Sequence, residues 1–339
     1  SQFFVINSSF NPNEKTKVFA EFALSNNDAN LFSDIDDESN KGYASKFNWE
    51  QLLLDKNWRI AAELSYEFVH QNFKVEQRFE TVEFQRDWNL INPLGDKHQF
   101  NLGLQIAKTK DISISYGFQQ LHYTQNYKGY KQLLKMNSIF NKTSFAFDAS
   151  FLNSTSSNEK NSFARAKARL EQSFSKKWIG GFIDYESNAK RDAITNNLQQ
   201  LSHRFTEYES YIGLGDSTQI YVKLGVNYRE NDSIRNADFT RISSRNTYYI
   251  ESKLIQNNNT NLAVYANYKD SKNSFIDNEK SLNAKVMYSQ KPFGNFIQSA
   301  TVYETSSGNV PRQEYIYLKT EPGLGYYTWI DYNLSLIHI

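Results

Sequence analysis

Apolar and polar residues alternate one by one along most of this chain, and no other feature restricts its fold as strongly. Between residues 58 and 68 the odd positions are mostly polar or charged, and the even positions are Trp58, Ile60, Ala62, Leu64, Tyr66 and Phe68. Successive side chains of a β-strand point to opposite faces of its sheet. The pattern therefore predicts a strand of about eleven residues with one apolar and one polar face.

The same alternation recurs along the chain and predicts about sixteen strands, with no convincing amphipathic helix. The further segments are 43–53, 73–80, 82–90, 99–106, 112–119, 144–151, 163–172, 178–186, 204–214, 220–228, 247–255, 261–269, 281–289, 296–304 and 313–319.

One stretch breaks the parity of the pattern. Apolar residues fall on odd positions from Phe73 to Phe79 but on even positions from Val82 to Trp88. A shift by one residue moves every side chain to the other face, so we expect a bulge or a turn near Thr81.

The connections show a second pattern, in which short turns tend to alternate with long polar loops. The short turns are 55–57, 108–111, 175–177, 215–217, 256–259 and 290–294, and the long loops are 25–42, 153–161, 187–202, 229–244, 270–280 and 305–312. Outer-membrane barrels combine short turns at one end with longer loops at the other, and their strands have one apolar face. The sequence therefore predicts an all-β fold, an antiparallel up-and-down transmembrane β-barrel or a large part of one.

The composition agrees with this fold. Mean hydropathy is −0.67, yet 15% of the residues are aromatic, which fits strands that need only one apolar face for lipid. Apolar runs such as 52–54 are far shorter than the roughly 18 to 20 residues of a membrane-spanning helix. A girdle of aromatic residues is expected at the edges of the apolar band, and we assign to it Trp49, Trp58, Trp88 and Trp178.

Charged residues predict which faces point into a lumen. Arg165, Lys167, Arg169 and Glu171 share one face of a segment whose other face is rich in alanine. Each basic charge would cost about 2 to 4 kcal/mol in mid-bilayer, so this face is expected to point inward. The same role is assigned to Glu83 and Asp87, and to the polar face of the first segment, Arg59, Glu63 and Glu67. Such charges fit either a selectivity ring or ion pairs that hold neighbouring strands or a plug.

Other kinds of chemistry have little support in the sequence. There are 38 Lys and Arg against 37 Asp and Glu, five scattered His and no Cys. We therefore expect no nucleic-acid partner, no metal site, no cofactor and no catalytic residues. The run Asp34–Glu38 fits a solvated acidic loop better than a cation site.

The segments Tyr43–Leu90 and Tyr315–Asn333 resemble large, poorly characterised outer-membrane β-barrel proteins of Bacteroidota. The first contains Glu76-Gln-Arg-Phe79 and Glu83-Phe-Gln-Arg-Asp-Trp-Asn-Leu90. The likeness is one of pattern, covers most of the chain loosely and carries no catalytic motif. It implies that the chain is an internal fragment and that its protein lies in the outer membrane of a Gram-negative bacterium.

The resulting division of the chain is a barrel segment at 1–320, a post-barrel turn region at 321–333 and a tail at 334–339 that we interpret as non-native. In the turn region, Asp331-Tyr-Asn333 is similar to the start of a cation loop and stops short of one. The tail resembles translated sequencing-adapter read-through.

We expect a non-enzymatic protein that serves passage or secretion across the outer membrane, or anchors a surface assembly. Its partners would be outer-membrane lipid and a plug or a surface or periplasmic protein. Two alternatives remain at this stage. One is a soluble or surface-attached all-β binding protein such as an adhesin or glycan binder, and the other is a barrel enzyme with its site at the loop rim.

Overall fold

The computed structural model of the chain describes residues 2–27, 39–74, 80–108, 111–216, 219–275, 277–292, 296–307, 329–332 and 335–338. The chain divides into two units, Ser1–Ser307 and Gly308–Ile339. The second unit contains a short antiparallel hairpin formed by β17 (Trp329–Tyr332) and β18 (Ser335–His338).

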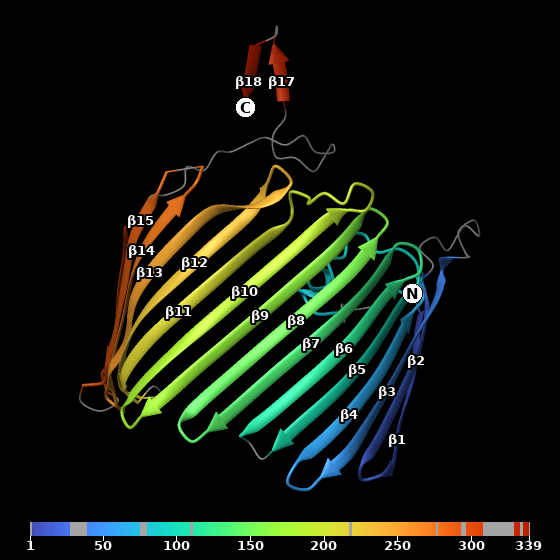
Figure 1. Cartoon of the computed structure of the whole chain (residues 1–339), viewed down its shortest axis with the longest axis horizontal. Helices are drawn as coiled ribbons and strands as arrows, with labels where there is room; N and C mark the ends of the chain where they lie inside the picture. The colour runs from blue at the N-terminus through green and yellow to red at the C-terminus, as the bar shows by residue number, and fades with distance from the viewer. Residues whose placement is uncertain are drawn as a thin grey trace. The chain divides into compact units, whose positions relative to one another are not determined.

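The first unit is one 16-stranded sheet in which each strand pairs with the next along the chain (Figure 1). Its strands are β1 (Gln2–Asn13), β2 (Thr16–Asn26), β3 (Lys41–Asp55), β4 (Arg59–Val69), β5 (Lys97–Lys108), β6 (Ile112–Tyr123), β7 (Tyr127–Phe140), β8 (Thr143–Ser156), β9 (Glu159–Phe174), β10 (Lys177–Asp192), β11 (His203–Gly215), β12 (Tyr221–Arg235), β13 (Asp238–Gln256), β14 (Thr260–Asn273), β15 (Glu279–Gln290) and β16 (Ser299–Ser307). The expected all-β class and antiparallel up-and-down order are confirmed.

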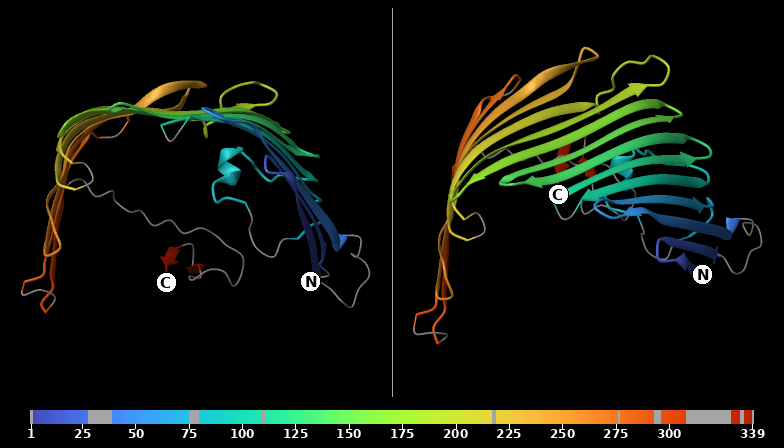
Figure 2. Two further views of the ribbon diagram at one scale, coloured as in Figure 1. Left: turned by 90° about the horizontal axis from the view of Figure 1, so that it is seen from below. Right: turned by 60° about the horizontal axis from the view of Figure 1, so that its bottom comes forward.

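The sheet is curved but open. Its two edges are β1 and β16, which are not hydrogen-bonded to each other in the described part of the chain. The short helix α1 (Phe84–Asp87) lies on the concave side of the sheet (Figure 2). We call this side the concave face and the other side the outward face. The turn end is the end where β1 connects to β2, and the loop end is the opposite one.

The two faces differ sharply in chemistry, as neighbouring cross-strand rows show. One outward row, read strand by strand from β4 to β12, is Ile60, Ile106, Ile114, Met136, Phe147, Ala168, Ile183, Tyr208 and Tyr228. The adjacent concave row on the same strands is Ala61, Gln105, Ser115, Lys135, Asp148, Lys167, Asp184, Glu207 and Arg229. The period-2 pattern has thus kept the outward row apolar across nine consecutive strands, while the concave row is charged from β7 to β12 and uncharged on β4 to β6.

The strand predictions contain identifiable errors. The sequence analysis missed β1, β2, β7 and the short strands β17 and β18, and it placed a strand at 82–90 where the structure has α1. The expected strand at 313–319 and the acidic run Asp34–Glu38 lie outside the described residues, as does most of the segment 73–80. The predicted number of strands equals the sixteen strands of the large sheet partly because missed strands and wrongly placed strands offset one another.

Two expected long loops are in fact paired strand. The segment 153–161 belongs to β8 and β9, which are joined through residues 157–158, and 229–244 belongs to β12 and β13, joined through Asn236 and Ala237. Polarity stops alternating in these segments, but the backbone ladder continues because its hydrogen bonds do not depend on side-chain polarity. No helix of the described residues is long and apolar enough to cross a bilayer.

Candidate functional site

The connection between β4 and β5 leaves the sheet and packs on its concave face (Figure 2). We call its described part, residues 80–96, the docked segment. Phe84 and Trp88 lie four positions apart, which places both on one side of the single helical turn of α1. The parity break near Thr81 lies within this connection, after the chain has left the sheet at Val69.

Trp88 is the apolar anchor of the docked segment. It is only 2% exposed and is packed in a cluster with Leu121, Tyr127, Leu152 and Phe163 from strands β6 to β9. The Tyr127 hydroxyl donates a hydrogen bond to the Trp88 carbonyl oxygen. Trp88 therefore fills an apolar site on the largely polar concave face, and its burial fixes the docked segment at one position on the sheet.

Ion pairs join α1 to three strands of the concave face. The Arg86 Nη2 atom lies 3.0 Å from Glu186 Oε1 on β10, and Asp87 Oδ1 lies 2.7 Å from Arg165 Nη2 on β9. Lys131 Nζ on β7 lies 3.8 Å from the other oxygen of Asp87. Burial lowers the pKa of Arg86, but the neighbouring glutamates raise it by more, so its net pKa lies above the ordinary value.

Two further contacts complete the attachment of the docked segment. The Lys97 ammonium lies 2.8 Å from Glu80 of the segment and 2.9 Å from Glu67 on β4. The buried side-chain amides of Asn89 and Asn188 bond to each other. Asn89 has a positive φ of 50°, a conformation that asparagine tolerates better than most residues.

The four residues assigned to a ladder on β9 share the concave face. Arg165 pairs with Asp87, and the Lys167 ammonium lies 2.9 Å from Asp184 on the next strand. The Arg169 guanidinium lies 5.4 Å from the centroid of the Phe182 ring, and Glu171 accepts a hydrogen bond of 2.9 Å from the Tyr211 hydroxyl.

The remaining ladder residues divide into two groups. Arg59, Glu63 and Glu67 alternate along β4 on the face of Lys97. The expectation that Glu83 and Asp87 share a strand face is wrong, because Asp87 belongs to α1 and Glu83 is the residue before it. Glu83 instead pairs with Arg86 at 3.3 Å within the docked segment.

Two of the four tryptophans assigned to the girdle lie elsewhere. Trp49 is outward, opposite Leu64, and Trp58 precedes β4 with the Lys108 ammonium 5.5 Å from its ring centroid. Trp88 is buried in the docked segment, and Trp178 is buried on the concave face beside Tyr211 and Tyr221. Both positions are buried by packing on the concave face, so neither side chain can belong to an outward girdle.

Aromatic residues of the outward face do gather at the loop end, which the sequence analysis missed. The ring centroids of Tyr43 and His70 are 4.9 Å apart, those of Phe68 and His98 5.0 Å, and those of His98 and His122 5.9 Å. Tyrosine and histidine rather than tryptophan form this belt. The sequence does contain a sign of this cluster, because aromatic residues recur at the apolar positions near the ends of the predicted strands.

In a second set of concave contacts, tyrosine side chains lie over glycines of the neighbouring strand. Tyr211 on β11 lies across Gly180 of β10 and reaches Glu171 on β9. Tyr249 on β13 likewise lies across a glycine of β12, and its hydroxyl donates to Glu209 on β11. Each tyrosine therefore links three strands, which a side chain at the glycine position would prevent.

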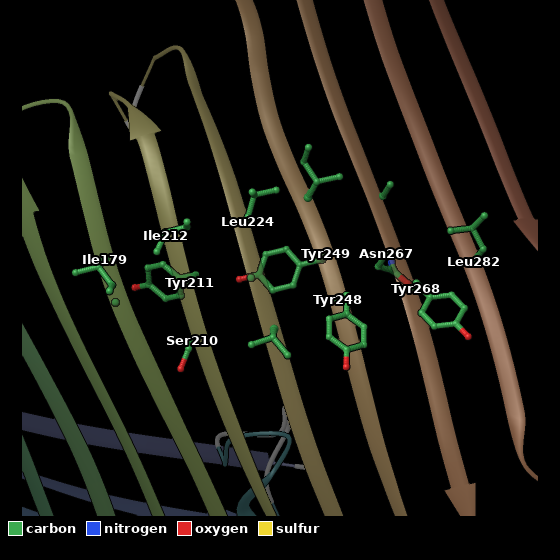
Figure 3. Close-up of a pocket in the computed structure, with 15 residues that line it drawn as sticks. Ile179, Ser210, Tyr211, Ile212, Leu224, Tyr248, Tyr249, Asn267, Tyr268 and Leu282 are labelled. Atoms are coloured by element: carbon green, nitrogen blue, oxygen red, sulfur yellow. The ribbon is translucent and has the colours of Figure 1, made fainter.

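The outward face of β10–β15 contains a shallow hollow of about 800 Å³ (Figure 3). Its lining includes Ile179, Ile212, Leu224, Tyr248 and Tyr268 and has no charged side chain. The hollow therefore offers no charged group to a polar ligand.

The described residues contain no group of three or more His, Cys, Asp or Glu placed to hold a metal ion. No model of a protein family matches the chain, and a search of curated proteins finds no relative.

Proposed function

We propose that the sheet is an outer-membrane β-barrel, or a large part of one, in which the outward face contacts lipid and the concave face lines a lumen. The observation that carries this proposal is the pair of adjacent rows described above, an outward row that is apolar across nine strands and a concave row that is charged on β7 to β12. A soluble sheet of this width would expose the apolar rows to water on a scale that soluble monomers avoid. In lipid the same rows need no cover.

The length of the apolar band supports this assignment. On β5 the outward face is apolar from Phe100 to Ile106, between His98 at the loop end and Lys108 at the turn end. About nine to eleven tilted residues suffice for a strand to cross the hydrocarbon core. The stretch from His98 to Lys108, eleven residues counted inclusively, therefore matches the length of a crossing, and the apolar part between these two ends is seven residues long.

The protein's role is then passage or secretion across the outer membrane of a Gram-negative bacterium, or anchoring of a surface assembly, without enzymatic chemistry. The docked segment supports passage over anchoring alone, because it occupies the concave face of β7–β10 in the manner of a plug. Ion pairs and one buried aromatic side chain hold it, and both can be weakened without unfolding the sheet. Closure of the barrel requires that β1 and β16 each find a strand partner, since unpaired edges are very costly in lipid.

Single-tryptophan variants test the proposal. One variant keeps Trp49, the other keeps Trp178, and the remaining tryptophans are replaced by phenylalanine. After refolding into liposomes of brominated phosphatidylcholine, we expect strong quenching of Trp49 fluorescence and little quenching of Trp178. Equal quenching of both would contradict the assigned faces. A stable β-type circular dichroism spectrum in plain buffer with no quenching of either would favour the soluble binding protein.

A further inference from the structure

A row of basic side chains crosses the outward face of β5–β10 at the loop end. Directly paired residues in this row, taken strand by strand, are His98, His122, Lys128, Thr155, Lys160 and Arg191. Every position except that of Thr155 carries a cationic or titratable basic group. We call these five side chains the basic row.

The basic row lacks the carboxylates that neutralise several concave cations of the same strands. Lys97, Lys131, Arg165 and Lys167 all have a carboxylate oxygen within 4.0 Å. Among the described residues no such ion pair involves the basic row.

The groups that face the row are neutral or distant from its centre. The Lys128 ammonium lies 5.3 Å from the centroid of the Tyr130 ring, and Arg191 donates to the carbonyl oxygen of Asn196. The carboxylate of Asp96, just before β5, lies 3.9 Å from His70, which is outside the row. The charge along the row is therefore largely uncompensated by the protein.

The position of the row indicates its surroundings. Aromatic contacts lie directly at its edge, where the Tyr66 hydroxyl hydrogen-bonds to His98 Nδ1 at 2.8 Å and Phe68 packs against the same ring. Below it the apolar rows begin. In membrane proteins this succession from apolar to aromatic to basic corresponds to the level of lipid head groups.

We infer that the basic row binds the phosphate groups of anionic lipids in the leaflet at the loop end. This inference rests on the proposed membrane function. Neighbouring strands are about 4.8 Å apart, so six strands spread the charges over about 24 Å, a length that suits a layer of lipids better than one small ion. Attraction to an anionic leaflet does not need a preformed pocket, because each Lys or Arg near the surface contributes independently.

The test uses the full chain refolded into nanodiscs that contain either phosphatidylcholine alone or phosphatidylcholine mixed with phosphatidylglycerol. Native mass spectrometry then measures how many phosphatidylglycerol molecules stay bound and how tightly. The variant carries Lys128→Gln, Lys160→Gln and Arg191→Gln. Its matched control carries Lys56→Gln, Lys142→Gln and Lys176→Gln, which remove three exposed charges from tight turns at the turn end of the sheet.

We expect retention of phosphatidylglycerol to be about 100-fold weaker in the triple variant, which follows from three charges near an anionic surface. The control should retain the lipid like the original chain. Equal retention by the triple variant would overturn the inference while leaving the membrane function intact. Failure to insert into either nanodisc, shown by unquenched Trp49 in brominated lipid, would overturn the proposed function and this inference with it.

Two competition experiments distinguish lipid from other anionic ligands. Displacement of the lipid by millimolar inorganic phosphate would assign the row to free phosphate. Displacement by a short DNA oligonucleotide, with stronger binding of DNA than of vesicles, would assign it to nucleic acid. Either result would contradict a lipid site.

Discussion

The side-chain amides of Asn89 and Asn188 hydrogen-bond to each other in both directions, at 2.9 and 2.8 Å, although 99 positions separate them in the chain. Both side chains are buried, so each amide satisfies the other where water cannot reach. This pair couples the docked segment to β10 through uncharged groups, beside the ion pairs of Arg86 and Asp87.

Loss of that amide pair should loosen the docked segment. Asn188→Ala leaves the Asn89 amide buried without its partner, which costs about 1–3 kcal/mol. We expect faster trypsin cleavage after Arg86 while the β-type circular dichroism spectrum stays unchanged. Asn153→Ala, on the exposed face of β8, is the control and should cleave at the original rate. Equal rates for both variants would show that the amide pair does not hold the segment.

Charge changes on the concave face should shift ion selectivity in opposite directions. Lys167→Gln with Arg169→Gln leaves Asp184 unpaired and makes the face more negative, so the reversal potential in planar bilayers should move toward cation preference. Asp184→Asn with Glu207→Gln should move it toward anions. An unchanged potential in both variants would argue that these charges only hold strands together.

A single outward arginine should hinder insertion, whereas its neighbour should not. Ile114→Arg places a charge in the middle of the apolar row and should cost about 2–4 kcal/mol of stability in lipid. Ser115→Arg puts the same side chain on the concave face of the same strand and should be tolerated. Urea titration of the liposome-inserted variants measures the difference, and similar midpoints would refute the assigned faces.

The glycine under Tyr211 should not tolerate a methyl group. A Cβ at Gly180 would come 2.4 Å from the Tyr211 ring, so Gly180→Ala must displace the ring and break its bond to Glu171. We expect a loss of about 1–3 kcal/mol in the free energy of unfolding. At Gly103 the nearest side-chain atom would be at 3.5 Å, so Gly103→Ala should be neutral or slightly stabilising. Equal losses would point to a general need for glycine in the concave rows.

The tip of the β12–β13 hairpin carries removable strain. Asn236 and Ala237 have φ of 52° and 61°, a left-handed pair that favours glycine at the second position. Ala237→Gly should therefore raise the free energy of unfolding by about 1 kcal/mol. Ala237→Val should lower it, since β-branched residues avoid this region. Thermal unfolding of both variants checks the two signs.

Alternation alone was enough to find strands such as β4, β5 and β6, whose apolar and polar positions are cleanly separated. It failed at β1, where Phe3–Ile6 is apolar without interruption, and at β7, where Leu133 and Leu134 are adjacent. In both strands apolar residues occupy both faces, and in β1 all of them are exposed, so the period disappears from the sequence while the backbone pairing remains.

The docked segment was wrongly predicted as a strand at 82–90 for a related reason. Val82, Phe84 and Trp88 on one parity imitate a strand, although a spacing of four between the last two suits one helical turn equally well. The one distinguishing sign was the parity break near Thr81.

The concave site itself could not be predicted, because its contacts depend on register. Asp87 and Arg165 are 78 positions apart, and nothing local to either residue specifies the other. The charges on β9 could be assigned to one face from sequence. Their partners follow only when the strands are aligned.

The extension of β12 and β13 past the apolar band has a mechanical consequence. Beyond Tyr228 the strand β12 continues to Arg235, about 20 Å along its own axis, with its partner hydrogen-bonded alongside. A peptide or domain spliced in between Asn236 and Ala237 would therefore stand on a paired stem whose height and direction are set by strand register. Such an insert would be held rigidly on a paired two-stranded extension of the sheet and not on a flexible linker.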